Sequence, residues 1–186
     1  MRLEPHLARR AANHRPLTPL DFLERALTNF PQRPAVAWRD RRWTYAQLGH
    51  IVANFAAFLR AQGVGPGDVV SVMSGNRPEM LAAHYAVPMV GAVLNSINTR
   101  LDAATVRYIV DHSESRLIVA DPSSFGLAAA VAGDAGISAF RLVDPTAPGA
   151  EDLDLLSGDA PMPHDLAAEI ADEWQPICIN DTSGTT

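Results

Sequence analysis

The stretch from Val69 to Ala120 reads VVSVMSGNRPEMLAAHYAVPMVGAVLNSINTRLDAATVRYIVDHSESRLIVA, and it decides the fold. Short apolar runs at 69–73, 93–95 and 116–120 alternate with longer segments whose apolar residues recur every three or four positions. The short runs are typical of buried strands, and the longer segments are typical of amphipathic helices. Strands that alternate with helices in this way pair in parallel. We therefore predict an α/β fold: a mostly parallel sheet with helices on both faces.

Local signals place the ends of the two helices in this stretch. Asn76 is the expected N-cap of the first helix, because Glu79 follows it by three residues, and Pro88 should end or kink that helix. Asp102 is the expected cap of the second. His84 shares the apolar side of the first helix with Met80, Leu81 and Val87, and without a second ligand nearby it is interpreted as a core histidine rather than a metal ligand.

The chain before this stretch predicts a helix, a hairpin and a second helix. Residues 1–16 are expected to form a loose arm, and residues 17–30 a helix that starts at Thr18-Pro19. Residues 35–38 and 42–43 predict a short β-hairpin. Thr44 and Gln47 form a capping-box pattern at the start of the next helix, which Gly63 should terminate in a left-handed conformation.

After Ala120 the same alternation continues. We expect a helix at 125–132, a strand at 140–143, a short helix at 166–171 and a last strand that contains Cys178. The acidic, Pro- and Gly-rich segment 144–163 is interpreted as a solvated loop, because its aspartates have no regular spacing and no partner histidine. Cys178 is expected to be a small buried core residue rather than a nucleophile.

Composition narrows the classes of function. The chain has 186 residues, a formal charge of −6 and one cysteine, so no intrachain disulfide can form and nucleic acid is an unfavourable partner. We find no apolar run long enough to cross a membrane and no export signal after Arg9-Arg10. The sequence therefore predicts a cytoplasmic protein, and it does not indicate an oligomeric state.

The last five residues offer four hydroxyl groups around one glycine. Thr182, Ser183, Gly184, Thr185 and Thr186 follow the last predicted strand, where such folds place ligands. Gly184 permits a tight turn, and successive backbone N–H groups in such a turn bind anions. The pattern differs from the Walker loop G-x-x-x-x-G-K-[ST]. By itself it is a weak signal for phosphate binding.

The wider context strengthens this signal, because the chain resembles the adenylate-forming enzymes, that is, the AMP-binding acyl-CoA synthetases and their relatives. Residues 179–186 are similar to the start of that family's phosphate loop, T-S-G-T-T-G-x-P-K-G. Other similar stretches follow in the family's order: Asp40-Arg41-Arg42-Trp43-Thr44-Tyr45, Gly63-Val64-Gly65-Pro66-Gly67-Asp68, Asn76-Arg77-Pro78-Glu79, Asn98-Thr99-Arg100-Leu101 and Tyr108-Ile109-Val110-Asp111-His112-Ser113. Residues 17–26 and 87–89 resemble most the branch of fatty-acyl and plant-type acyl-activating ligases.

The resemblance implies a two-step reaction with ATP, Mg²⁺ and coenzyme A. A carboxylic acid attacks ATP to give an acyl-adenylate and pyrophosphate, and CoA then displaces AMP. The resemblance makes Thr182, Ser183, Gly184, Thr185 and Thr186 phosphate binders, and it assigns no catalytic or metal-binding residue. Residues 17–186 are then a partial adenylation domain that ends inside the phosphate loop, and we expect such an N-terminal fragment to be inactive alone.

The sequence departs from the family's pattern at one position, and two alternative functions remain open. Asp181 stands where the family usually has an aromatic residue, so its carboxylate either weakens ATP binding by repulsion or points away from the phosphates, and we expect the second. The chain could instead belong to an adenylating enzyme that loads a carrier protein, or be a non-catalytic α/β module. The acid and its chain length are not indicated.

Overall fold

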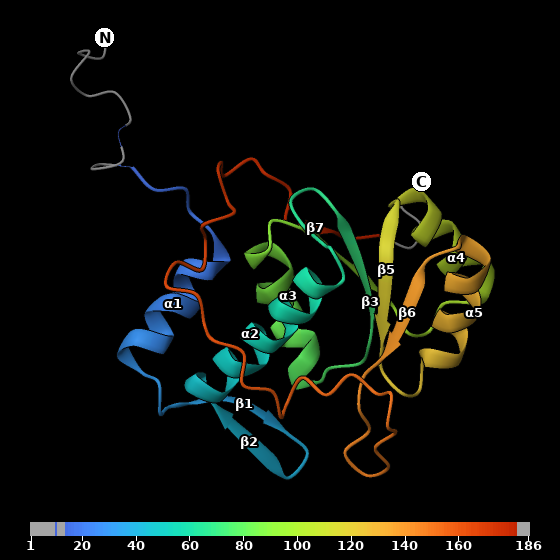
Figure 1. Cartoon of the computed structure of the whole chain (residues 1–186), viewed down its shortest axis with the longest axis horizontal. Coiled ribbons are helices and arrows are strands. Elements are labelled where there is room, and N and C mark those ends of the chain that lie inside the picture. The colour runs from blue at the N-terminus through green and yellow to red at the C-terminus, as the bar shows by residue number, and fades with distance from the viewer. Residues whose placement is uncertain (1–9, 11–13, 182–186) are drawn as a thin grey trace, which may run out of the picture.

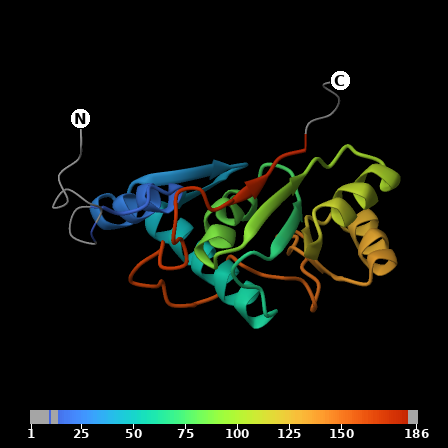
Figure 2. The same cartoon turned by 90° about the horizontal axis from the view of Figure 1, so that it is seen from above.

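The structure is a computed structural model that describes residues 10 and 14–181. A parallel five-stranded sheet in the order β6-β5-β3-β4-β7 forms its centre, which confirms the predicted fold class (Figures 1 and 2). The elements are α1 (Pro19–Asn29), β1 (Pro34–Trp38), β2 (Arg41–Thr44), α2 (Tyr45–Ala61), β3 (Val69–Met73), α3 (Pro78–Met89), β4 (Val93–Ile97), α4 (Ala103–His112), β5 (Ser115–Ala120), α5 (Phe125–Ala135), β6 (Ser138–Arg141) and β7 (Cys178–Ile179).

Helices cover both faces of the sheet because alternate residues of each strand point to opposite sides. Val70, Val72 and Leu94 belong to the core that α2 and α3 share. Met73 and Ile97, by contrast, pack with residues of α4 and α5 on the other face. Figure 1 shows α1 and the antiparallel β1–β2 hairpin at one side of the molecule and α4 and α5 at the other.

Most of the predicted helix signals are confirmed. Thr18 and Thr44 cap α1 and α2, each within a capping box. In the second box the Thr44 N–H donates to Gln47 Oε1 at 2.8 Å. Gly63 has a φ of 73° just after α2, and Asp102 caps α4. These predictions hold because each depends only on residues three or four positions apart.

The predicted start of α3 is wrong. Arg77, not Asn76, is the N-cap residue, and no side chain caps this helix. Glu79 does not reach back to the backbone, because its carboxylate binds the guanidinium of Arg77 instead, with Nη2–Oε1 at 2.7 Å. An ion pair with the nearby Arg77 thus replaces the expected capping hydrogen bond of Glu79.

The segment between β6 and β7 also differs from the prediction. The predicted helix at 166–171 is wrong, because residues 166–169 form a turn and residues 170–171 have no regular structure. The acidic segment 144–163 is not wholly solvated, because Leu155 is buried against the α2–α3 side of the core. Asn54 on α2 holds the loop in place: its Nδ2 donates to the Leu155 carbonyl and its Oδ1 accepts from the Ala160 N–H, both at 2.9 Å.

A buried polar cluster joins three strands of the sheet. The hydroxyls of Ser71 and Ser115 lie 2.6 Å apart, and Asn95 Nδ2 donates to Ser71 Oγ at 3.0 Å and to Ser113 Oγ at 3.1 Å. Asn95 Oδ1 is buried without a hydrogen-bond partner among the residues described. The cluster fixes β4 against β3 and β5, directly beside the position where β7 joins.

Candidate functional site

The candidate site lies at the carboxyl edge of the sheet. Because β3, β4, β5 and β7 are parallel, their carboxyl ends share one edge, where α/β folds place ligands. β7 joins this edge through the pairs Leu94–Cys178 and Asn95–Ile179, and Leu94 N–H donates to the Ile177 carbonyl at 3.0 Å (Figure 2). The chain that leaves β7 towards residue 182 therefore starts at the ligand-binding edge.

The predicted phosphate binders Thr182, Ser183, Gly184, Thr185 and Thr186 lie outside the described residues, so their role stays a prediction. Asn180 and Asp181, which lead into them, are described and exposed. Asp181 makes no hydrogen bond or ion pair with any other described residue.

A hollow of about 430 Å³ lies beside this point. Its walls come from the end of β4, from α4 and from the residues after β7: Asn98, Leu101, Thr105, Tyr108, Ile109, His112, Asn180 and Asp181. Tyr108 is 65% exposed, and its ring stacks on the His112 imidazole with a centroid distance of 5.5 Å. The hollow combines a flat aromatic surface with the polar side chains of Asn180 and Asp181.

The described residues provide no set of ligands for a metal ion. No group of three or more His, Cys, Asp or Glu side chains is close enough to hold one in the part of the chain that the structure describes. Asp181 offers a single carboxylate, whereas Mg²⁺ is commonly held by one or two carboxylates together with substrate phosphates.

Asp121 organises a second part of this edge, although no motif in the sequence singles it out. Its carboxylate accepts hydrogen bonds from the Gly75 N–H at 2.8 Å, the Ser123 hydroxyl at 2.7 Å and the Ser124 N–H at 2.9 Å. Burial acts to raise the pKa of Asp121, but these hydrogen bonds outweigh it and hold the pKa below its ordinary value. The residue thereby ties the loop after β3 to the loop after β5.

A buried ion pair links this region to the hairpin. The guanidinium of Arg77 binds both carboxylate oxygens of Glu79, at 2.7 and 3.3 Å, and donates to the Val143 carbonyl at 2.7 Å. It also lies 5.4 Å from the ring centroid of Trp38. The side chains of Arg77 and Glu79 are only 8% and 1% exposed. One cation thus joins α3, the hairpin and the chain after β6.

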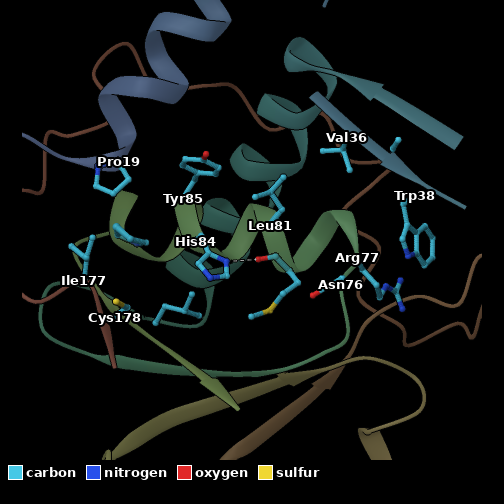
Figure 3. Close-up of a pocket in the computed structure, with 14 residues that line it drawn as sticks. Pro19, Val36, Trp38, Asn76, Arg77, Leu81, His84, Tyr85, Ile177 and Cys178 are labelled. Carbon is cyan, nitrogen blue, oxygen red and sulfur yellow. Dashed lines mark hydrogen bonds between the residues drawn. The ribbon is translucent and has the colours of Figure 1, made fainter. Parts of the chain in front are cut away.

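A groove of about 620 Å³ lies on the α3 face of the sheet (Figure 3). It corrects two predictions. His84 is exposed rather than buried, and its Nδ1 bonds the Met80 carbonyl at 2.9 Å. Cys178 is exposed as well and lines the same groove.

Known proteins resemble this chain in sequence. The AMP-binding enzyme family matches residues 23–186. An acetate–CoA ligase of Humulus lupulus is 36% identical over 200 residues, which cover 97% of this chain and 35% of that protein. A peroxisomal benzoate–CoA ligase of Arabidopsis thaliana is 36% identical over 94% of this chain and 33% of that protein. The chain thus spans about a third of the length of the curated relatives it matches.

Solved structures show the same fold. A fatty acyl-CoA synthetase of Mycobacterium tuberculosis superposes with a TM-score of 0.72 and 28% identity, over 87% of this chain and 32% of that one. The N-terminal domain of FACL13 from the same organism gives a TM-score of 0.66 and 27% identity over 77% and 37%. No described helix is long and apolar enough to cross a membrane. The family match covers most of the chain, and the chain therefore belongs to the AMP-binding enzyme family.

Proposed function

We propose that the chain is part of an ATP-dependent carboxylic acid–CoA ligase. The acid attacks the α-phosphate of ATP to give an acyl-adenylate and pyrophosphate, and the CoA thiol then displaces AMP to give the thioester. The observation that carries the proposal is the family match over residues 23–186, together with relatives that are named acetate–, butyrate– and benzoate–CoA ligases. Those names also favour CoA over a carrier protein as the thiol acceptor.

In this proposal the residues after β7 hold the phosphates. Thr182, Ser183, Thr185 and Thr186 offer hydroxyl donors, and Gly184 lets the backbone N–H groups approach the β- and γ-phosphates. These donors stabilise the charge that builds up on the departing pyrophosphate. Mg²⁺, when bound with ATP, would supply further neutralisation of the phosphates. The proposal draws support from the parallel register of β7, which starts this loop at the carboxyl edge of the sheet.

For the acid substrate we propose only a chemical class. The solved neighbours include a fatty acyl-CoA synthetase, and the curated relatives are named for short and aromatic acids, so we propose a fatty or other acyl acid. We also propose that the 186-residue chain alone is inactive, because it spans about a third of its relatives. A cytoplasmic location remains part of the proposal, and the relatives named as peroxisomal provide the alternative.

ATP–pyrophosphate exchange tests the function. The product of the complete gene is assayed with acetate, butyrate, benzoate and a long-chain fatty acid, and the CoA thioester is detected by mass spectrometry. Thr185→Val should reduce kcat/KM for ATP by about 10- to 100-fold, since a hydrogen bond to a charged group contributes about 1.5–3 kcal/mol.

Thr146→Val is the matched control, because it removes a hydroxyl from an exposed loop residue that bonds only Asp144. It should leave the exchange rate unchanged. Absence of exchange with every acid, or equal rates for the two variants, would contradict the proposed function.

A further inference from the structure

The order of the strands creates a second place for a ligand at the carboxyl edge of the sheet. The crossover from β3 leads to β4 on one side of β3, and the next crossover leads to β5 on its other side. The loops that follow β3 and β5 therefore diverge from each other, and open α/β sheets bind ligands at such a switch point. The predicted phosphate loop lies elsewhere, because β7 is on the far side of β4.

A pocket of about 270 Å³ occupies this switch point. Residues 75–77 line it from the loop after β3 and residues 121–123 from the loop after β5, while residues 38–39 of the hairpin and residues 144–145 after β6 complete the walls. The volume corresponds to about nine water molecules at about 30 Å³ each. It is smaller than the about 300–1,000 Å³ of pockets for drug-sized ligands, so the pocket suits a smaller molecule.

The pocket offers hydrogen-bond donors that the protein does not use. The Arg77 side chain is only 8% exposed, and its Nε and Nη2 bind Glu79 and the Val143 carbonyl, but its Nη1 has no acceptor among the described residues. The side chains of Arg39 and Asn76 line the same pocket and make no hydrogen bond or ion pair with a described residue. Guanidinium groups with unused N–H donors are preferred binders of oxyanions.

Arg39 is held at the pocket in an unfavourable backbone conformation. Its φ of 56° lies in the left-handed region, where hairpin turns usually place Gly or Asn. Its guanidinium lies 4.4 Å from the ring centroid of Trp38, and the guanidinium of Arg77 lies 5.4 Å from the same ring (Figure 3). One indole thus positions both cations, and strained residues of this kind cluster at ligand-binding sites.

Two carboxylates restrict which anion can bind. Asp121 shares its charge with the three donors described above. Asp144 Oδ1 accepts from the Thr146 N–H at 2.9 Å and from its hydroxyl at 2.7 Å, whereas Oδ2 has no donor among the described residues. These hydrogen bonds, followed by the charges of Arg39 and Arg77, hold the pKa of Asp144 below its ordinary value, so the group is ionised at pH 7. It repels a bare anion but accepts a hydrogen bond from a ligand hydroxyl.

We propose that this pocket binds a polyol phosphate, that is, a phosphate monoester with hydroxyl groups beside the ester. The phosphate lies against Arg39, Arg77 Nη1 and the Asn76 amide, and a hydroxyl donates to Asp144 Oδ2. Such a ligand satisfies the free donors and the free acceptor of the pocket together. The site is separate from the predicted phosphate loop, and it does not depend on the proposed ligase function.

Glycerol 3-phosphate is the probe. The ¹⁵N-labelled 186-residue chain is titrated with it, with inorganic phosphate and with glycerol, at pH 7 and constant ionic strength, and the amide resonances of Gly75 and Asn76 are followed by NMR. They should shift saturably with glycerol 3-phosphate, with a Kd at least about 10-fold below that of inorganic phosphate, since the hydroxyl adds a hydrogen bond to a charged group. Glycerol alone should cause no shift. Equal Kd values for the two anions, or no saturable shift, would overturn the proposal.

Variants separate the pocket from general electrostatic attraction. Arg39→Gln should raise the Kd of glycerol 3-phosphate by about 10- to 100-fold. Arg42→Gln is the matched control, because Arg42 is exposed on the same hairpin but does not line the pocket, and it should leave the Kd unchanged. Asp144→Asn should tighten binding of inorganic phosphate and remove the preference for glycerol 3-phosphate. Equal effects of the two arginine variants, or weaker binding of both anions by Asp144→Asn, would contradict the assignment.

The same titration separates this site from the ligase reaction. Shifts confined to Asn180 and Asp181 would mean that the phosphate binds only at the predicted phosphate loop, which refutes this pocket and leaves the proposed function standing. Saturable shifts at Gly75 and Asn76, combined with a complete gene product that shows no ATP–pyrophosphate exchange, would do the reverse. Calorimetry on the complete gene product should show the same difference between Arg39→Gln and Arg42→Gln, and its absence there would overturn the proposal.

Discussion

Removing Arg77 should destabilise the protein strongly, because the change leaves a carboxylate buried without a partner. Glu79 is 1% exposed, and its two carboxylate oxygens bind the guanidinium at 2.7 and 3.3 Å. Breaking a buried ion pair by removing one partner costs about 3–5 kcal/mol. The same variant frees the Val143 carbonyl, which Arg77 binds at 2.7 Å. We therefore expect Arg77→Met to lie within that range, with the loss of the carbonyl bond pushing it towards the upper end.

Urea unfolding followed by circular dichroism measures this cost. At a slope of about 2 kcal/mol per M, the Arg77→Met midpoint should fall by about 2 M. Arg77→Met combined with Glu79→Met should be less destabilised than Arg77→Met alone, since no buried charge remains. The coupling between the two sites should reach about 2 kcal/mol in a double-mutant cycle.

An exposed ion pair between an arginine and a carboxylate is the control. Arg107 and Asp111 lie 2.6 Å apart on α4, but their side chains are 37% and 51% exposed. Arg107→Met should leave the urea midpoint unchanged within error, because solvent screens such a pair. If Arg77→Met costs less than about 1 kcal/mol, or no more than Arg107→Met, then burial does not govern this ion pair and the reasoning fails.

Three further predictions test local features. Thr44→Ala should lower the free energy of unfolding by about 1 kcal/mol through loss of the α2 cap, whereas Asn76→Ala should change the urea midpoint little, because Asn76 caps nothing. Asp121 has a lowered folded-state pKa, so the stability it contributes is present above its unfolded pKa of about 3.9 and is lost as pH falls through the folded value. Asp121→Asn should therefore lower the free energy of unfolding at pH 7 and flatten its dependence on pH in acid. A variant whose free energy of unfolding changes with pH in parallel with that of the unsubstituted protein would contradict this. Gly136→Ala should cost about 1–2 kcal/mol, from its φ of 71° alone, and Gly91→Ala should cost more in the same thermal melts, because its Cβ would also meet Pro66 at 3.0 Å.

The fold could be predicted from the sequence because its signals are local. Alternating apolar runs, the capping box at Thr44 and the cap at Asp102 each depend on residues within one turn or one strand, and the structure bears them out. The α3 start failed because Glu79 binds Arg77 instead of the backbone, in contacts that also include Val143 and Trp38. A pattern three residues long contains no information about partners that distant.

The burial of single residues was the weakest part of the prediction. His84 and Cys178 lie among apolar residues in the sequence, which favours a core position, yet both face the groove on α3. Leu155 shows the opposite error, because a segment rich in acidic residues still buries this side chain against the core. Whether such a side chain is buried depends on which other elements cover its helix or strand, and this depends on the order of the strands in the sheet. The alternation of strands and helices in the sequence does not reveal that order.

The short pairing of β7 with β4 has a consequence for the order of assembly. Single helical crossovers join β3, β4, β5 and β6 in turn. The chain reaches β7, which pairs with β4, only after the long acidic segment that follows β6. Contacts between segments so far apart in the chain form late, because closing a long loop costs entropy before any contact compensates for it. Two residue pairs then hold β7 in place. A ligand that binds the chain after β7 only when β7 is paired with β4 would stabilise that pairing. The apparent affinity for such a ligand would be lower the smaller the fraction of molecules in which β7 is paired.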